Sequence, residues 1–365
     1  MPATRKGEIM KKRYVFSAAA ILIDLAAMFL FPKFPDVFFP FYRDLSKAWI
    51  GLLSRLCSFM KIALWDIGAL VLAVTAIASL IYVITKKRSF FNWLSHVLAA
   101  VSILLSIAIL GWMLNHYAPK LSEELSLNVK EYSYEELYES TEYYYDMASL
   151  YSSLIPRDEN GHALKQDFYE MAKLAGSSYE KLKDTYPIFR GSDVPVKKLS
   201  VIGEYLMYNG IVGMFMPITG EAGVPGSVPV VPLAFTMAHE AGHRLGLAAE
   251  EEANFAAFLA CANSEDVRFL YSGYYNAFSY CFSALYRADQ EEALELYRSK
   301  EEIGYQLIKL DRSDTYEAYQ KYDSPLQEVS DKVNDTYLKT FSQKEGIRSY
   351  GIVTDYLIAW HLAGR

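Results

Sequence analysis

The sequence predicts a mainly α-helical protein with a small β-sheet, in which N-terminal transmembrane helices are followed by a water-soluble domain. Hydrophobic residues make up 52% of the 365 residues, and they are concentrated before about residue 115. Beyond that point most segments have apolar residues at helical spacing, and only residues 199–232 are broken into short apolar runs by Gly and Pro. We therefore divide the chain into a membrane region, 1–115, and a soluble domain, 116–365.

Three apolar runs are each long enough to cross a bilayer once: Tyr14–Phe31, Ala63–Thr85 and Trp93–Leu114. The first follows basic residues, as a signal peptide does. It lacks a small-residue cleavage site and two spans follow it, so we expect it to be retained as an anchor. Asp24 lies near its middle, where an interhelical hydrogen bond is a simpler expectation than a relay or ligand. These features predict an integral protein of the cell membrane, with the lipid bilayer as a partner.

Two basic clusters, Lys11–Arg13 and Lys86–Arg88, are expected on the cytoplasmic side. This orientation places the domain after Leu114 outside the cytoplasm. The segment Phe34–Lys61 would then also be external, and four basic residues in it oppose the assignment: Arg43, Lys47, Arg55 and Lys61. Its apolar residues alternate with these charges in a way that predicts an amphipathic helix lying on the bilayer surface.

The soluble domain is predicted to be helical on both sides of a short sheet. Helices are expected over Ser122–Leu154 and Leu164–Tyr186, and again after Ser264. The runs Val201–Tyr208 and Ile211–Ile218 predict strands, and the glycine-containing segment after them, 219–226, predicts turns that lead into a helix.

Composition excludes several classes of function. The net charge of −7 and the lack of a basic surface after the membrane region argue against a nucleic-acid partner. Three cysteines without CxxC spacing, Cys57, Cys261 and Cys281, predict neither a disulfide framework nor a cysteine-rich zinc site. Any metal would be held by histidine and carboxylate.

The segment His239-Glu240-Ala241-Gly242-His243 is the strongest chemical signal in the chain. Pro232 suits the first turn of the helix that would carry it. Two histidines four residues apart project from one helix face, so both imidazoles can bind one Zn2+, and Glu240 points beside them toward a water molecule. This is the HExxH pattern of zinc peptidases. The simpler alternative is a pair of surface histidines, which a mostly apolar helix disfavours.

A third metal ligand is available shortly after this motif. Gly246 can end the helix, and Glu250, Glu251 and Glu252 follow. We expect Glu250 to be the ligand because Asn254 shares its face and can support it by hydrogen bonding. Glu251 is the alternative, and acidic residues that only complement a helix dipole are common at this position.

These segments resemble known metallopeptidases. The glycine after the second histidine is similar to the metzincin turn, whereas Glu250 followed by Asn254 resembles the gluzincin ligand helix. The runs 216–222, 233–240 and 250–255, together with 348–357 and the three spans, resemble a bacterial family of membrane-anchored HExxH proteins of unknown function. The resemblance covers nearly the whole chain and implies a zincin-like α+β metallopeptidase domain, but no particular substrate.

The predicted activity is therefore hydrolysis of a peptide or protein substrate. His239, His243 and Glu250 would hold Zn2+, and Glu240 would take a proton from the activated water and pass it to the leaving amine. A strand near Gly213–Ile218 could align an extended substrate, and Tyr350 is the candidate to stabilise the oxyanion. The remaining histidines are expected at solvent or interface positions: His96, His116, His162 and His361.

Two other functions compete with this prediction. In the first, the protein is a non-catalytic, membrane-anchored binding or scaffold protein with a structural or vestigial zinc site; Glu240 argues against it, because a structural site needs no general base. In the second, the protein is an intramembrane protease, which would need its HExxH motif inside a span. The motif lies more than a hundred residues beyond the last span.

Overall fold

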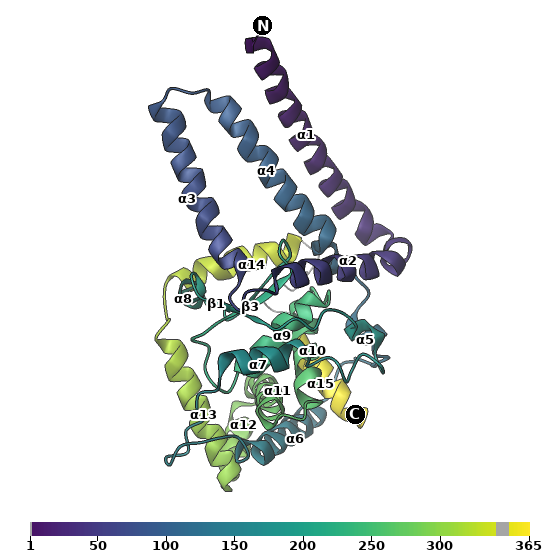
Figure 1. Cartoon of the computed structure of the whole chain (residues 1–365). Coiled ribbons are helices and arrows are strands. Elements are labelled where there is room, and N and C mark those ends of the chain that lie inside the picture. The colour runs from purple at the N-terminus through teal and green to yellow at the C-terminus, as the bar shows by residue number, and fades with distance from the viewer. Residues whose placement is uncertain (1, 341–349) are drawn as a thin grey trace.

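The computed structural model describes residues 2–340 and 350–365. Three long helices project from one side of a mainly helical body, with the N-terminus at their far end (Figure 1). They are α1 (Pro2–Leu30), α3 (Leu64–Thr85) and α4 (Phe90–Gly111), and each belongs to a segment long and apolar enough to cross a membrane. The loop between α3 and α4 lies at the same far end as the N-terminus, so the two basic clusters of the sequence share one side.

Helices α1 and α4 pack along each other, and a polar contact joins them. The Ser106 hydroxyl donates a 2.8 Å hydrogen bond to Asp24, whose side chain is buried. The interhelical hydrogen bond predicted for Asp24 is therefore confirmed.

A short 3-10 helix, η1 (Phe31–Lys33), leads from α1 into α2 (Pro35–Cys57), which crosses the body at the base of the three long helices (Figure 1). One face of α2 packs on the body through Ile50 and Ser54, and the Ser54 hydroxyl contacts the Gly220 carbonyl. The opposite face leaves large apolar side chains exposed, including Phe41 and Leu45. The predicted amphipathic helix is thus present.

The start of α3 is held by carboxylates. Glu221 accepts hydrogen bonds from the main-chain N–H groups of Leu64 and Trp65, which form the first turn of that helix. Asp66, fully buried, accepts three more from the main chain at Ser200–Ile202. Buried carboxylates that satisfy helix and loop N–H groups fix the two segments together. The second span is therefore joined directly to the small sheet of the body.

That sheet has three strands in the order β1-β3-β2. Strand β1 (Lys197–Leu199) is parallel to β3 (Glu221–Pro225), and β2 (Met214–Met216) is antiparallel to it. The predicted strand over Ile211–Ile218 contains β2 and is confirmed.

Two local assignments in this region were wrong. Residues 201–208 contain the helix α8 (Gly203–Tyr208), because Asp66 holds the main-chain N–H groups that precede it. The expected turn region contains the central strand β3 instead. Gly223 makes that strand possible, because a Cβ there would lie 2.6 Å from Leu199 of β1. The glycine thus serves close strand packing and not a turn.

Helices surround the sheet. Helix α9 (Leu233–Arg244) packs against β2 and β3 on one side and against α7, α10 and α11 on the others, so almost its entire surface is buried.

The predicted helix over Leu164–Tyr186 is shorter than expected, because α7 ends at Gly176, where the main chain at Asp193 approaches too closely for a side chain. The remaining elements are η2 (Met113–Tyr117), α5 (Leu121–Glu124), α6 (Tyr134–Ser152), α7 (Phe168–Gly176), η3 (Pro187–Phe189), α10 (Glu250–Ala262), α11 (Val267–Ala288), α12 (Gln290–Ser299), α13 (Ile303–Gln320), α14 (Leu326–Thr340) and α15 (Tyr350–Leu362).

Candidate metal site

Local sequence signals set both ends of helix α9. Pro232 stands at its N-cap, as the sequence predicts for the helix start. At the other end Gly246 has φ +88°, the N–H of Leu247 bonds to the Gly242 carbonyl and that of Gly246 to the His243 carbonyl. This is a Schellman ending, which requires a residue with positive φ and so favours glycine. Helix α10 begins four residues later, at Glu250.

The turn between the two helices brings three side chains together. His239 Nε2 lies 3.3 Å from one carboxylate oxygen of Glu250, and His243 Nε2 lies 3.6 Å from the other. One ligand atom from each of the three residues lies within 4.8 Å of the other two, an arrangement that can hold a metal ion. The expected ligand set is therefore assembled from two adjoining helices.

The hydrogen bonds around the imidazoles suit metal binding. His243 Nδ1 lies 2.7 Å from the Leu247 carbonyl oxygen, so Nδ1 carries the proton and Nε2 has its lone pair free. His239 Nδ1 is buried and has no hydrogen-bond partner among the described residues, and the same holds for Nδ2 of Asn254. Burial lowers the pKa of His239, but Glu250 and, to a smaller extent, Asn254 outweigh it and raise that pKa. The Asn254 side chain therefore lies where it can support His239.

Burial and the neighbouring charged side chains together set the pKa values in the cluster. Burial raises the pKa of Glu240 to about 8 and, together with His239, lowers the pKa of His243 to about 4. Burial opposes ionisation of Glu250 as well, but the two imidazoles outweigh it and lower the pKa of Glu250 to about 2. A negative carboxylate facing two imidazole nitrogens in a buried site is a favourable position for a cation.

Glu240 lies beside the cluster and next to the edge strand. A Cβ on Gly213 would lie only 2.3 Å from Glu240 Oε1, so the carboxylate packs directly against this glycine, which immediately precedes β2. The other oxygen, Oε2, is buried without a hydrogen-bond partner among the described residues. The arrangement leaves Glu240 with a free carboxylate oxygen for proton transfer.

The other two acids of the triplet point elsewhere. Glu252 accepts a 2.8 Å hydrogen bond from the main-chain N–H of Leu121, at the start of α5. Glu251 is outside the group of possible metal ligands that the described residues form. Among the three acids, the geometry thus selects Glu250.

Two residues next to the cluster, Trp112 and His116, could not be assigned to it from the sequence. The Trp112 indole donates a 2.8 Å hydrogen bond to the His243 carbonyl, and its ring lies edge-on to the rings of both His243 and His116. His116 is close enough to the cluster to interact electrostatically with His243 and Glu250, and burial lowers its pKa to about 3. The solvent or interface position expected for His116 is therefore wrong. Nothing in its sequence neighbourhood distinguished it, because the fold alone brings η2 to the end of α9.

The other three histidines have ordinary surroundings. His162 pairs with Asp314 at the surface, and His361 stacks on Tyr143. His96 is exposed on α4. Helix α15 begins at Tyr350, but the side chain of Tyr350 lies outside the described residues, so its predicted role in stabilising an oxyanion stays a prediction.

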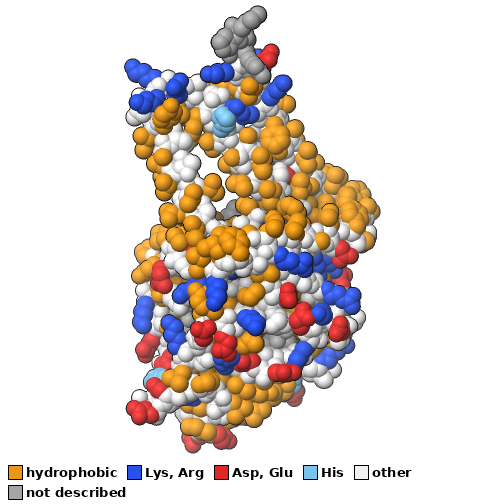
Figure 2. Space-filling model, in the orientation of Figure 1, with side chains coloured by type: hydrophobic (Ala, Val, Ile, Leu, Met, Phe, Trp, Pro, Cys, Tyr) orange, Lys and Arg blue, Asp and Glu red, His pale blue; other side chains and the backbone are white. Residues whose placement is uncertain are grey.

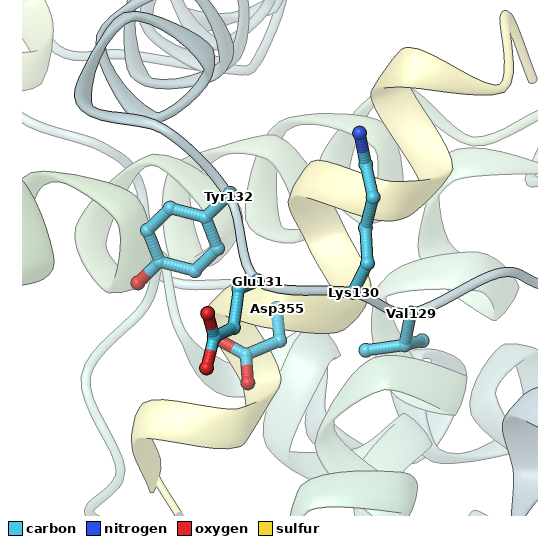
Figure 3. A pocket seen from close by; sticks show the side chains of 5 residues that line it. All are labelled: Val129, Lys130, Glu131, Tyr132 and Asp355. Carbon is cyan, nitrogen blue, oxygen red and sulfur yellow. The ribbon is translucent and has the colours of Figure 1, made fainter.

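A surface pocket of about 410 Å³ lies away from this cluster, between the segment before α6 and helix α15. Figure 3 shows the side chains of Glu131 and Asp355 in it, with Lys130 directed away. Burial raises the pKa of Asp355 to about 6. The lining includes none of the HExxH residues, so we assign this pocket no part in the candidate site.

Comparison with known proteins adds the family and nothing more specific. No curated protein and no solved structure matches the chain. A family model described as "Protein of unknown function (DUF3810)" matches residues 41–358, which include most of α2, two of the three spans and the candidate metal site. The chain therefore belongs to the DUF3810 family.

Proposed function

We propose that the protein is a membrane-anchored zinc metallopeptidase. The observation that carries the proposal is the convergence of His239, His243 and Glu250 within 4.8 Å, with the Glu240 carboxylate beside them. Two imidazoles and one carboxylate are the ligand set of many catalytic zinc sites. When bound, Zn2+ supplies Lewis-acid chemistry, acidifying water and polarising a peptide carbonyl.

The buried polar atoms fit this group. The lone pair of His243 Nε2 and the carboxylate of Glu250 face each other, with the His243 side chain buried and those of His239 and Glu250 partly buried. A bound cation offsets the cost of partly burying these polar groups.

Glu240 has the position of a general base. Its carboxylate accepts a proton from the attacking water and returns it to the amine that leaves. The neighbouring strand β2 is at the edge of the sheet, and no strand of the described residues pairs with its outer side. An extended peptide can therefore add to this edge by main-chain hydrogen bonds, which would place its carbonyl groups near Glu240.

Metal analysis of the full chain in detergent tests the proposal. We expect about one zinc per chain, as for a single three-ligand site. His239→Ala should remove it, whereas His162→Ala, which alters a surface pair with Asp314, should keep it. Zinc-free protein with an intact fold would refute the proposal.

A second variant separates the enzyme from a scaffold with a structural zinc site. Glu240→Gln should retain zinc and fold but lose hydrolysis of a mixed peptide pool. If wild-type protein binds zinc and cleaves no peptide under any tested condition, the non-catalytic alternative is preferred.

We also propose that the body lies outside the cytoplasm. The supporting feature is the common location of Lys11–Arg13 and Lys86–Arg88 at the far end of the spans. Two of the basic residues that opposed this orientation have partners in the body: Arg43 pairs with Glu124, and Lys47 bonds to the Ile188 carbonyl. A reporter active only outside the cytoplasm, fused after Arg365, should be active, and activity of a cytoplasmic reporter alone would reverse the map.

A further inference from the structure

The apolar face of helix α14 (Leu326–Thr340) points away from the body, which is the reverse of the usual arrangement in a water-soluble protein. Its apolar side chains are exposed: Leu326 by 43%, Val329 by 59% and Val333 by 66%. The side chains that are half-buried against the body are polar, among them Gln327 and Ser330. At 100° per residue the three apolar positions fall within about 60° of arc. A coherent apolar stripe therefore points away from the protein.

Such a helix gains little stability from the rest of the described chain. Helix α14 makes few contacts with any other element, and most of its side chains are exposed. Helices of about this length are marginal in water unless their apolar face is covered. We therefore expect the apolar stripe of α14 to lie in an apolar environment.

The position of α14 identifies that environment. Tyr322, just before the helix, bonds to Glu204 and packs on Tyr208, so the start of α14 lies against α8. Helix α8 in turn follows the segment that Asp66 of α3 holds. In Figure 1, α14 lies at the level of α2, where the three spans meet the body.

The same level carries other exposed apolar side chains. Helix α2 exposes Phe41, Leu45 and Leu56, and α8 exposes Tyr205 by 60%. Figure 2 shows hydrophobic side chains in a band beneath the spans, with acidic and basic side chains over the body below it. An apolar band at the end of three membrane-spanning helices continues the lipid-facing surface of those helices.

We propose that α14 and α8, together with α2, seat the body on the bilayer, with the apolar stripe of α14 buried at the boundary between headgroups and acyl chains. The charged residues Asp331 and Lys332 then remain in water. This contact is independent of the proposed peptidase activity, because it depends on no metal and no substrate.

Fluorescent labels on the full chain in lipid nanodiscs test the proposal. In a Cys57→Ser background, Val333→Cys is labelled with an environment-sensitive dye; the other cysteines, Cys261 and Cys281, are buried. The matched control is Asp331→Cys, about 160° away around the same helix. A second control is Ile303→Cys, which is 69% exposed at the start of α13. Helix α13 begins beside α6, as the packing of Gly304 against Ser149 shows, at the end of the body away from the spans.

We expect the label at position 333 to be quenched by spin-labelled acyl chains and to be several-fold less accessible to aqueous iodide than the labels at 331 and 303. Equal iodide quenching at 333 and 331 would show that the stripe faces water. Protection of position 333 from both quenchers would show that protein covers it. Either result overturns the proposal, and neither bears on zinc binding or hydrolysis.

Discussion

The indole N–H of Trp112 donates a 2.8 Å hydrogen bond to the main-chain carbonyl of His243. Trp112 directly follows the last residue of α4, and His243 is a candidate metal ligand in the last turn of α9. The indole also packs on Phe215 of strand β2, with ring centroids 5.0 Å apart. The end of the third span thus contacts both the helix and the strand that border the candidate site.

Trp112→Phe should weaken zinc binding several-fold and lower stability by about 1 kcal/mol, because the variant keeps a ring but loses the donor to the buried carbonyl. Trp65→Phe is the matched control: Trp65 is also buried, but its indole nitrogen has no hydrogen-bond partner among the described residues. Thermal unfolding and chelator competition measure the two effects. Equal losses in both variants would mean that the hydrogen bond to His243 contributes nothing specific.

The candidate site was largely predictable because its signals are local. The helical spacing of His239 and His243, the stop at Gly246 and the register of Glu250 all depend on residues within about four turns of chain, where backbone geometry is regular. The contacts of Trp112 and His116 depend on how the third span meets the body. No short sequence pattern predicts this contact between the third span and the body.

In the sheet region, local sequence patterns predicted the wrong secondary structure. Gly223 and its neighbours look like a turn because glycine is common in turns, yet β3 is the central strand and requires a glycine where the Leu199 side chain of β1 packs against it. Residues 201–208 look like a strand because they are apolar, yet Asp66, more than a hundred residues earlier, holds the N–H groups that precede α8. Tertiary contacts override local preference in both cases.

Gly213→Ala should abolish peptide hydrolysis while zinc stays bound. A Cβ at this position would lie 2.3 Å from Oε1 and 2.8 Å from Cδ of Glu240, so the carboxylate must move. Activity on a peptide pool and zinc content are measured together. The control is Gly351→Ala, where a Cβ meets nothing within 4 Å. Full activity of Gly213→Ala would show that Glu240 has room to shift without loss of function.

Asp355→Asn should stabilise the protein at neutral and alkaline pH. Burial raises the pKa of Asp355 from 3.8 to about 6, so the fold favours the protonated carboxyl. The stability that this preference contributes is present below about pH 4 and is lost as the pH rises through 6. The variant should therefore melt higher than wild type at pH 8, and the difference should shrink as the pH falls toward 4. A difference that does not change with pH, or one equal to that of the exposed control Asp323→Asn, would contradict this assignment.

The acidic triplet gives the sharpest comparison within one site. Glu250 faces both imidazoles, whereas Glu252 caps the start of α5 through the Leu121 N–H. Glu250→Ala should therefore lose zinc almost completely. Glu252→Ala should retain zinc and instead lower stability by about 1 kcal/mol, the usual cost of a lost helix cap.

The neighbouring positions fix the register of the ligand helix. Asn254 lies one turn after Glu250 and close to His239, so Asn254→Ala should weaken zinc binding about 10- to 100-fold, as loss of a residue that orients a ligand does. Glu251→Ala should leave zinc bound, because Glu251 projects about 100° away from Glu250 around the helix. Zinc affinities of the four variants, measured side by side in competition with a chelator, need no knowledge of the substrate. If Glu251→Ala strips the metal and Glu250→Ala keeps it, the ligand has been assigned one residue too early, and the two histidines would still define the site.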